Sequence, residues 1–196
     1  YTIRHKKKNH PRCQDRNEYK VVDAPESKGQ ILACIDVTLD EGSQILLKGD
    51  ALALGYWQQG GVVDFREQDG WFQTGDIGRW DGHVLTITGR RDNAFICGGE
   101  NLQPESIERI ICAYPAVKNA LVVPVADAKW GQIPIALIDW KREQREGLDD
   151  WLGQRVNGLQ RPRQLMPWRY VRFNNNKLDR RATARIVGEL IAKSSD

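Results

Sequence analysis

The chain has 196 residues, of which 40% are hydrophobic and 28% charged, and its formal net charge is +3. This composition suits one ordinary domain or two small ones with a buried core. No apolar run approaches the roughly 20 residues of a membrane-spanning helix, and no apolar signal segment opens the sequence, so we expect a soluble, cytoplasmic protein. The four cysteines form no C-x-x-C pair, which favours free thiols over a zinc site.

Positive charge is concentrated at the start of the chain. Residues 1–20 hold seven Lys or Arg against two acidic residues, a net of +5, so the remainder carries −2. Residues 1–28 are polar and show no periodic pattern, which predicts a disordered, solvated leader. Binding of nucleic acid or of an acidic surface through these charges is the alternative.

Residues 29–91 are predicted to form a β-rich subdomain. The apolar runs QILACIDVTL and SQILLKGDALAL flank Asp-Glu-Gly, which indicates a hairpin or meander, and the alternating run HVLTITG predicts another strand. The segment GWFQTGDIGRW places Asp76 in a predicted turn, where its carboxylate can accept two hydrogen bonds from a sugar diol. An ordinary Asp-containing turn is the simpler alternative.

Residues 92–196 are predicted to form a small α+β domain, with strands sandwiched between helices. Pro104 suits the first turn of a helix, in which apolar residues share one face: Ile107, Ile110, Ile111 and Tyr114. Strands are predicted at VKNALVVPVA, IPIALIDW and WRYVRF, with an amphipathic helix at 148–159 before the last strand. A final helix carries Ala182, Ile186 and Leu190 along one side.

Two stretches, one across the predicted boundary and one near the end of the sequence, hold residues that suit binding or catalysis. In TGRRDNAFICGGENLQPESIE, Arg90 suits a phosphate or ribose oxygen, and Gly98 and Gly99 allow a close ligand or a positive φ. A hairpin with a Gly turn and surface charges is the alternative there. In FNNNKLDRRATARI, three asparagines favour a turn before Lys177, and Asn176 is expected to cap the following helix. By itself Lys177 would be a solvated surface charge.

Together these motifs resemble the adenylate-forming acyl-CoA ligases, also called AMP-binding enzymes. Five motifs occur in the order and with the spacing of that family: GYW at 55–57, TGD at 74–76, GRRD at 89–92, GGENLQPESIE at 98–108 and KLDR at 177–180. The resemblance covers about residues 20–190. The segments YPAVKNALVVPVADAKWGQIP and LQRPRQLMPWRYV are most similar to the o-succinylbenzoate–CoA ligase branch, which serves menaquinone biosynthesis. A medium- or long-chain fatty acyl-CoA ligase is the alternative.

The resemblance implies a reaction in two halves. A carboxylate attacks the α-phosphate of ATP, which gives an acyl-adenylate and pyrophosphate, and the thiol of CoA then displaces AMP. The family's motifs imply these roles: Asp76 holds the ribose hydroxyls, Arg90 contacts ribose or α-phosphate, Asp92 is the hinge of a mobile C-terminal lid, Gly98 and Gly99 line the pantetheine channel, and Lys177 is the adenylation lysine. Asn176 stands where the family has glycine.

The family's remaining motifs are not found in this sequence. These are the Ser/Thr/Gly-rich phosphate loop, the Thr-Glu motif that holds Mg²⁺, and the acyl pocket. We therefore expect a C-terminal fragment, consisting of the last β subdomain (29–91) and the lid (92–196), which contains no metal ligand and does not adenylate by itself. A non-catalytic module that docks on a separate N-terminal half is the alternative.

Overall fold

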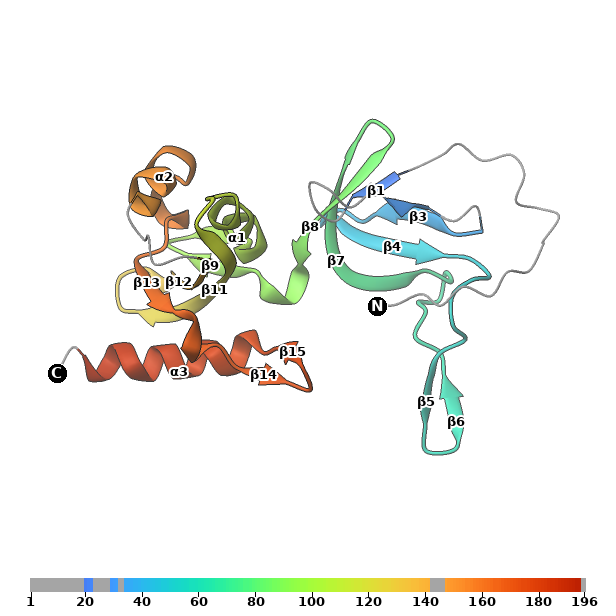
Figure 1. The fold of residues 1–196 in the computed structure, drawn as a ribbon. Helices are drawn as coiled ribbons and strands as arrows, with labels where there is room; N and C mark the ends of the chain where they lie inside the picture. Colours follow the sequence, from blue (N-terminus) through green and yellow to red (C-terminus); the bar gives the residue numbers. More distant parts are fainter. Residues whose placement is uncertain (1–19, 23–28, 32–33, 142–146, 195–196) are drawn as a thin grey trace. The chain divides into compact units, whose positions relative to one another are not determined.

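A computed structural model of the chain describes residues 20–22, 29–31, 34–141 and 147–194. The structure divides into two compact units, Tyr1–Thr88 and Gly89–Asp196. Figure 1 shows that the first unit consists of strands and the second combines strands with helices. The predicted α+β class is therefore confirmed.

The predicted leader, residues 1–28, lies outside the described residues except for Lys20–Val22. These three residues form strand β1 and pair in parallel with β8, so this part of the range is extended and hydrogen-bonded. No helix among the described residues is long and apolar enough to cross a membrane.

The first unit is built on a six-stranded sheet with the order β2-β1-β8-β7-β4-β3. Its strands are β1 (Lys20–Val22), β2 (Gly29–Gln30), β3 (Asp36–Leu39), β4 (Gln44–Lys48), β7 (Phe72–Asp81) and β8 (Val84–Arg90). Strands β3 and β4 form the predicted antiparallel hairpin. A separate hairpin consists of β5 (Tyr56–Gln58) and β6 (Gly61–Val63).

The TGD motif lies inside strand β7, and the prediction that Asp76 occupies a turn is wrong. Gly75 has a φ of +75°, and the pairing of β4 with β7 shifts register between Gln44 and Leu46. A positive φ with a register shift is typical of a β-bulge, which interrupts a strand without ending it. The glycine therefore bends the strand at the point where a turn was expected.

The second unit has a three-stranded sheet with the order β11-β12-β13. Strands β11 (Val117–Asp127) and β12 (Gly131–Trp140) are antiparallel, and β13 (Gln164–Pro167) runs parallel to β12. The third strand was predicted at WRYVRF, but residues Trp168–Tyr170 form a 3₁₀ turn, η3. Pro167 has no N–H for a ladder, so the strand ends there and the chain turns.

Helices cover both faces of this sheet (Figure 1). Helices α1 (Pro104–Cys112) and α2 (Leu148–Arg155) share one cluster of buried residues with Val122, and α3 (Arg180–Lys193) shares the other with Leu121 and Val123. Successive side chains of a strand point to opposite faces. Burial on both faces therefore explains the uninterrupted apolar runs of β11 and β12.

The phase of helix α3 differs from the prediction. Its fully buried residues are Thr183 and Val187, one turn apart, whereas Ala182, Ile186 and Leu190 are only half-buried. Thr183 is polar, so hydrophobicity alone misplaced the face. The Thr183 hydroxyl donates to the Asp179 carbonyl over 2.8 Å and accepts from the Arg172 N–H over 2.9 Å, which satisfies it inside the core.

The cap of helix α3 is Asp179 and not Asn176. A short hairpin, β14 (Phe173–Asn174) and β15 (Lys177–Leu178), precedes the helix. Asn175 and Asn176 have φ values of +47° and +60° and form its two-residue turn. Because strand β15 follows this turn, helix α3 begins only at Arg180. The Asp179 Oδ1 caps the helix by accepting from the Ala182 N–H over 2.8 Å.

Replacing Asp179 with alanine is expected to destabilise the second unit by about 1 kcal/mol, because the Ala182 N–H loses its acceptor. Asp179→Asn is the matched control, since asparagine caps a helix nearly as well. Urea unfolding followed by circular dichroism measures both variants. Equal losses in the two variants would show that the carboxylate charge matters and the cap does not.

Candidate functional site

Lys177 is the first residue of strand β15 and lies opposite Asn174 across the hairpin. Its side chain is exposed. It borders a hollow of about 600 Å³, here called the Lys177 hollow, whose wall is formed by Asn93, Glu108, Ala120, Leu121, Asn174, Asn175, Lys177, Leu178, Asp179, Arg180 and Arg181. Within the described part of the chain, neither Lys177 nor Arg181 makes a side-chain ion pair. Both cations are therefore available to an anionic ligand.

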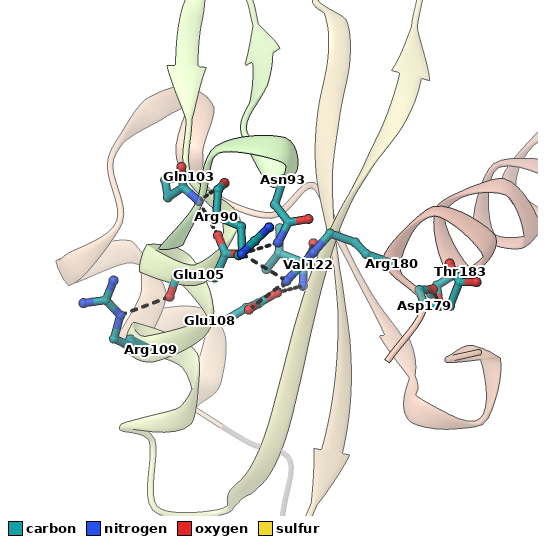
Figure 2. A network of polar contacts seen from close by, with 10 residues as sticks. All are labelled: Arg90, Asn93, Gln103, Glu105, Glu108, Arg109, Val122, Asp179, Arg180 and Thr183. Atoms are coloured by element: carbon teal, nitrogen blue, oxygen red, sulfur yellow. Dashed lines mark hydrogen bonds and ion pairs between the residues drawn. The ribbon is translucent and has the colours of Figure 1, made fainter. Parts of the chain in front are cut away.

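Figure 2 shows a half-buried group of polar side chains that we call the Arg180 cluster: Asn93, Gln103, Glu105, Glu108 and Arg180. Three of its members, Asn93, Glu108 and Arg180, also border the Lys177 hollow. The Arg180 Nη1 donates to the Glu108 Oε1 over 2.5 Å and also to the Val122 carbonyl. Its Nη2 lies 3.3 Å from the Glu108 Oε2 and 3.6 Å from the Glu105 Oε1. Arginine thus joins the start of α3 to helix α1 and strand β11.

The acidic members of the Arg180 cluster also receive neutral donors. The Glu105 carboxylate accepts from the Asn93 Nδ2 and the Gln103 Nε2, each over 2.5 Å, and Glu108 accepts from the Val122 N–H over 2.7 Å. The side chains of Arg180, Glu105 and Glu108 are only 16%, 22% and 15% exposed. Their charges therefore interact with little screening by solvent.

Arg90 and Asp92 lie next to the Arg180 cluster. Arg90 ends strand β8, and Asp92 lies in the 3₁₀ turn η1 (Arg91–Asn93). The Arg90 Nη2 is 3.7 Å from the Asp92 Oδ2, and the Arg90 carbonyl accepts from the Gln103 Nε2 over 3.0 Å (Figure 2). The Asp92 side chain is 67% exposed, so this ion pair adds little to stability.

A second hollow, of about 430 Å³, extends the site toward Asp92 and Phe95. Asn93, Arg180 and Arg181 border both this hollow and the Lys177 hollow. The structure therefore brings Lys177, at the far end of the sequence, into one surface region with the segment that contains Asp92. A concave region with exposed cations suits a phosphate-bearing ligand.

Gly98 and Gly99 form the turn between strands β9 (Phe95–Cys97) and β10 (Glu100–Leu102). Their φ values are +56° and +88°, as a two-residue hairpin turn requires. A Cβ on Gly98 would lie 2.7 Å from both Leu159 and Trp130. Hairpin geometry thus accounts for both glycines, and close packing is a second reason for Gly98 alone.

Asp76 belongs to the first unit, whereas the residues described so far belong to the second. Its backbone N–H donates to the Thr74 Oγ1 over 3.0 Å, and the Thr74 hydroxyl donates to the Ile45 carbonyl over 2.8 Å. The threonine of the TGD motif therefore fixes the backbone at the aspartate.

The described residues contain no group of three or more His, Cys, Asp or Glu that could hold a metal ion.

Sequence patterns predicted no site role for the members of the Arg180 cluster, although one signal was present. Pro104, Ile107 and Ile111 are buried on one face of α1, and Glu108 has the helical spacing of that face. A carboxylate on an apolar stripe requires a buried donor. The sequence does not show that this donor is Arg180, because 72 residues separate the two.

Residues 106–169 match the AMP-binding enzyme C-terminal domain. The chain is 36% identical over 149 residues to the 2-succinylbenzoate–CoA ligase of Salmonella typhimurium, covering 75% of this chain and 33% of that protein. Among solved structures it is similar to an Escherichia coli MenE variant with bound OSB-AMS (TM-score 0.71, 32% identity, 81% of this chain and 35% of that one).

A third similar protein is o-succinylbenzoate CoA synthetase (MenE) from Bacillus subtilis, in complex with the acyl-adenylate intermediate OSB-AMP. The TM-score is 0.68 at 28% identity, and the match covers 79% of this chain and 34% of that chain. The chain thus spans about a third of the length of the relatives it matches. It contains the C-terminal domain of the AMP-binding enzymes, and its similarity to 2-succinylbenzoate–CoA ligases extends over most of its own length.

Proposed function

We propose that the chain supplies the last β subdomain and the C-terminal lid of an ATP-dependent o-succinylbenzoate–CoA ligase. The observation that carries the proposal is the similarity to 2-succinylbenzoate–CoA ligases, which reaches 36% identity over three quarters of the chain. The exposed Lys177, at a hollow that Arg181 also borders, supports it.

Lys177 is the proposed adenylation lysine. When a carboxylate attacks the α-phosphate of ATP, two anions meet and negative charge accumulates as the bond forms. An ammonium group held at that point stabilises the transition state more than the ground state. Lysine suits this role because its charge is compact and its stem is long enough to reach out of the hairpin.

The other residues receive supporting roles. Asp76 would accept hydrogen bonds from the ribose hydroxyls, and Arg90 would contact the ribose or the α-phosphate. Asp92 would be the hinge, since it lies four residues after the division between the units and its side chain is exposed. Gly98 and Gly99 would line the pantetheine channel in the thioester-forming arrangement. No role proposed for these residues requires Mg²⁺.

A hybrid ligase tests the proposal. In it, residues 30–196 replace the matching C-terminal part of E. coli MenE. We expect pyrophosphate release with ATP and o-succinylbenzoate from the hybrid ligase and none from the 196-residue chain alone. A hybrid that folds and binds ATP without releasing pyrophosphate would contradict the proposal, and so would turnover by the chain alone. The choice between o-succinylbenzoate and a fatty acid is tested with the complete natural ligase that contains residues 30–196.

Docking on a separate N-terminal half is a second candidate function, favoured by an apolar surface on the first unit. Five residues on and beside the β5–β6 hairpin are about half exposed or more: Leu54, Tyr56, Trp57, Val62 and Val63. A group of neighbouring, exposed apolar side chains is typical of an interaction surface. Mixing the chain with the separately produced N-terminal part of E. coli MenE tests this function. Co-elution that is lost with Trp57→Ser would support docking, and separate elution would contradict it.

A further inference from the structure

We infer that Arg180 is a positioning residue for adenylation, which holds the Lys177 hairpin against the body of the lid domain. The inference rests on the proposed function of Lys177. Arg180 follows Lys177 by three residues and begins helix α3. Whatever fixes Arg180 therefore fixes the end of strand β15.

The guanidinium of Arg180 is held from three directions. Glu108 of helix α1 binds both of its terminal nitrogens, Glu105 lies one turn earlier on the same helix, and the Val122 carbonyl of strand β11 accepts a further hydrogen bond. A planar, forked donor can satisfy such a set, and the compact ammonium of lysine cannot. This geometry gives α3 one position relative to α1 and β11.

Strand β11 is an edge strand of its sheet. At Val122 the N–H donates to Glu108 and the carbonyl accepts from Arg180. The ion pair therefore closes the open edge at this residue, where unpaired backbone groups would otherwise need water. Arg180 is thus attached to rigid backbone as well as to side chains, which makes it an effective anchor.

A second set of contacts fixes the hairpin that contains Lys177 to the start of helix α3. The Asp179 N–H donates to the Arg172 carbonyl over 2.9 Å, and the buried Thr183 hydroxyl bridges Asp179 and Arg172. Both ends of the β14–β15 hairpin are therefore fixed to the first turn of α3. Lys177 lies between these ends, and its direction depends on the turn that Arg180 anchors.

The Arg180 cluster also reaches the proposed hinge. Glu105 connects Arg180 to Asn93, which follows Asp92, and Gln103 connects Glu105 to the Arg90 carbonyl (Figure 2). An unbroken series of polar contacts therefore joins residues 90–93 to the start of α3. A rotation of the lid about Asp92 would carry Lys177 with it as part of the same body.

The first test uses the 196-residue chain and requires no activity. Arg180→Lys keeps a positive charge but cannot reproduce the forked contact. We expect amide hydrogen exchange in a peptide covering 172–182 to become at least about tenfold faster, while exchange in β12 is unchanged. Arg185→Lys, an exposed cation on the same helix, is the control. Unchanged exchange in Arg180→Lys would overturn the positioning role.

The second test uses the hybrid ligase and separates the two half-reactions. We expect Arg180→Lys to lower the rate of pyrophosphate formation by about 10–100-fold, because a small misplacement of Lys177 is costly there. Thioester formation from added acyl-adenylate and CoA should stay within about twofold. Equal losses in both half-reactions would show a merely structural role and overturn the inference. An unsubstituted hybrid that folds but does not adenylate would instead contradict the proposed function, whatever the exchange experiment shows.

Discussion

Lys177→Ala in the hybrid ligase is expected to lower the rate of adenylation by about 10²–10³-fold, which is the usual effect of removing one preorganised electrostatic contact from a transition state. Thioester formation from preformed acyl-adenylate should change little, because no carboxylate approaches the phosphate in that step. Single-turnover measurements of pyrophosphate and of CoA thioester separate the two rates.

The matched control is Lys193→Ala, which removes an exposed lysine from the other end of α3. We expect both half-reactions of this variant to match the unsubstituted hybrid ligase. If Lys177→Ala and Lys193→Ala slowed adenylation equally, the general positive charge of the lid would be responsible and the role of Lys177 would be lost. If Lys177→Ala slowed both half-reactions equally, the residue would support the fold or bind a group common to both steps.

Sequence patterns predicted best the helices and strands whose apolar side chains follow the buried faces. The stripe from Ile107 to Tyr114 gave helix α1, and two uninterrupted apolar runs gave β11 and β12, because the sheet is covered on both faces. Elements set by single backbone conformations were misplaced. Gly75 bends β7 where a turn was predicted, and Pro167 ends β13 before the predicted strand begins.

In the candidate site, too, features set by neighbouring residues were predicted better than contacts between distant parts of the sequence. The position of Lys177 beside a turn was read from its neighbours, but the turn is Asn175-Asn176 within a hairpin, and the cap lies three residues beyond Asn176. The contact between Arg180 and Glu108 joins residues that local patterns cannot connect, since it depends on how α3 packs against β11. Glu108 alone signalled that a partner was needed.

Arg180→Leu is expected to destabilise the second unit by about 3 kcal/mol. The change leaves Glu105 and Glu108 as half-buried carboxylates without their cation, and removing one partner of such a group costs about 3–5 kcal/mol. It also removes the donor to the Val122 carbonyl on the sheet edge. The described α-helices all lie in the second unit, so helical circular dichroism during urea unfolding reports this loss.

Two further variants identify the cause of that loss. Arg181→Leu, the exposed neighbour on the same helix, should change stability by no more than about 0.5 kcal/mol. Adding Glu108→Gln to Arg180→Leu should restore about 1 kcal/mol, because the amide oxygen still accepts from the Val122 N–H while the unpaired charge is removed. If the double variant were less stable than Arg180→Leu, the loss would come from packing and hydrogen bonds, and the buried charge would not be its main cause.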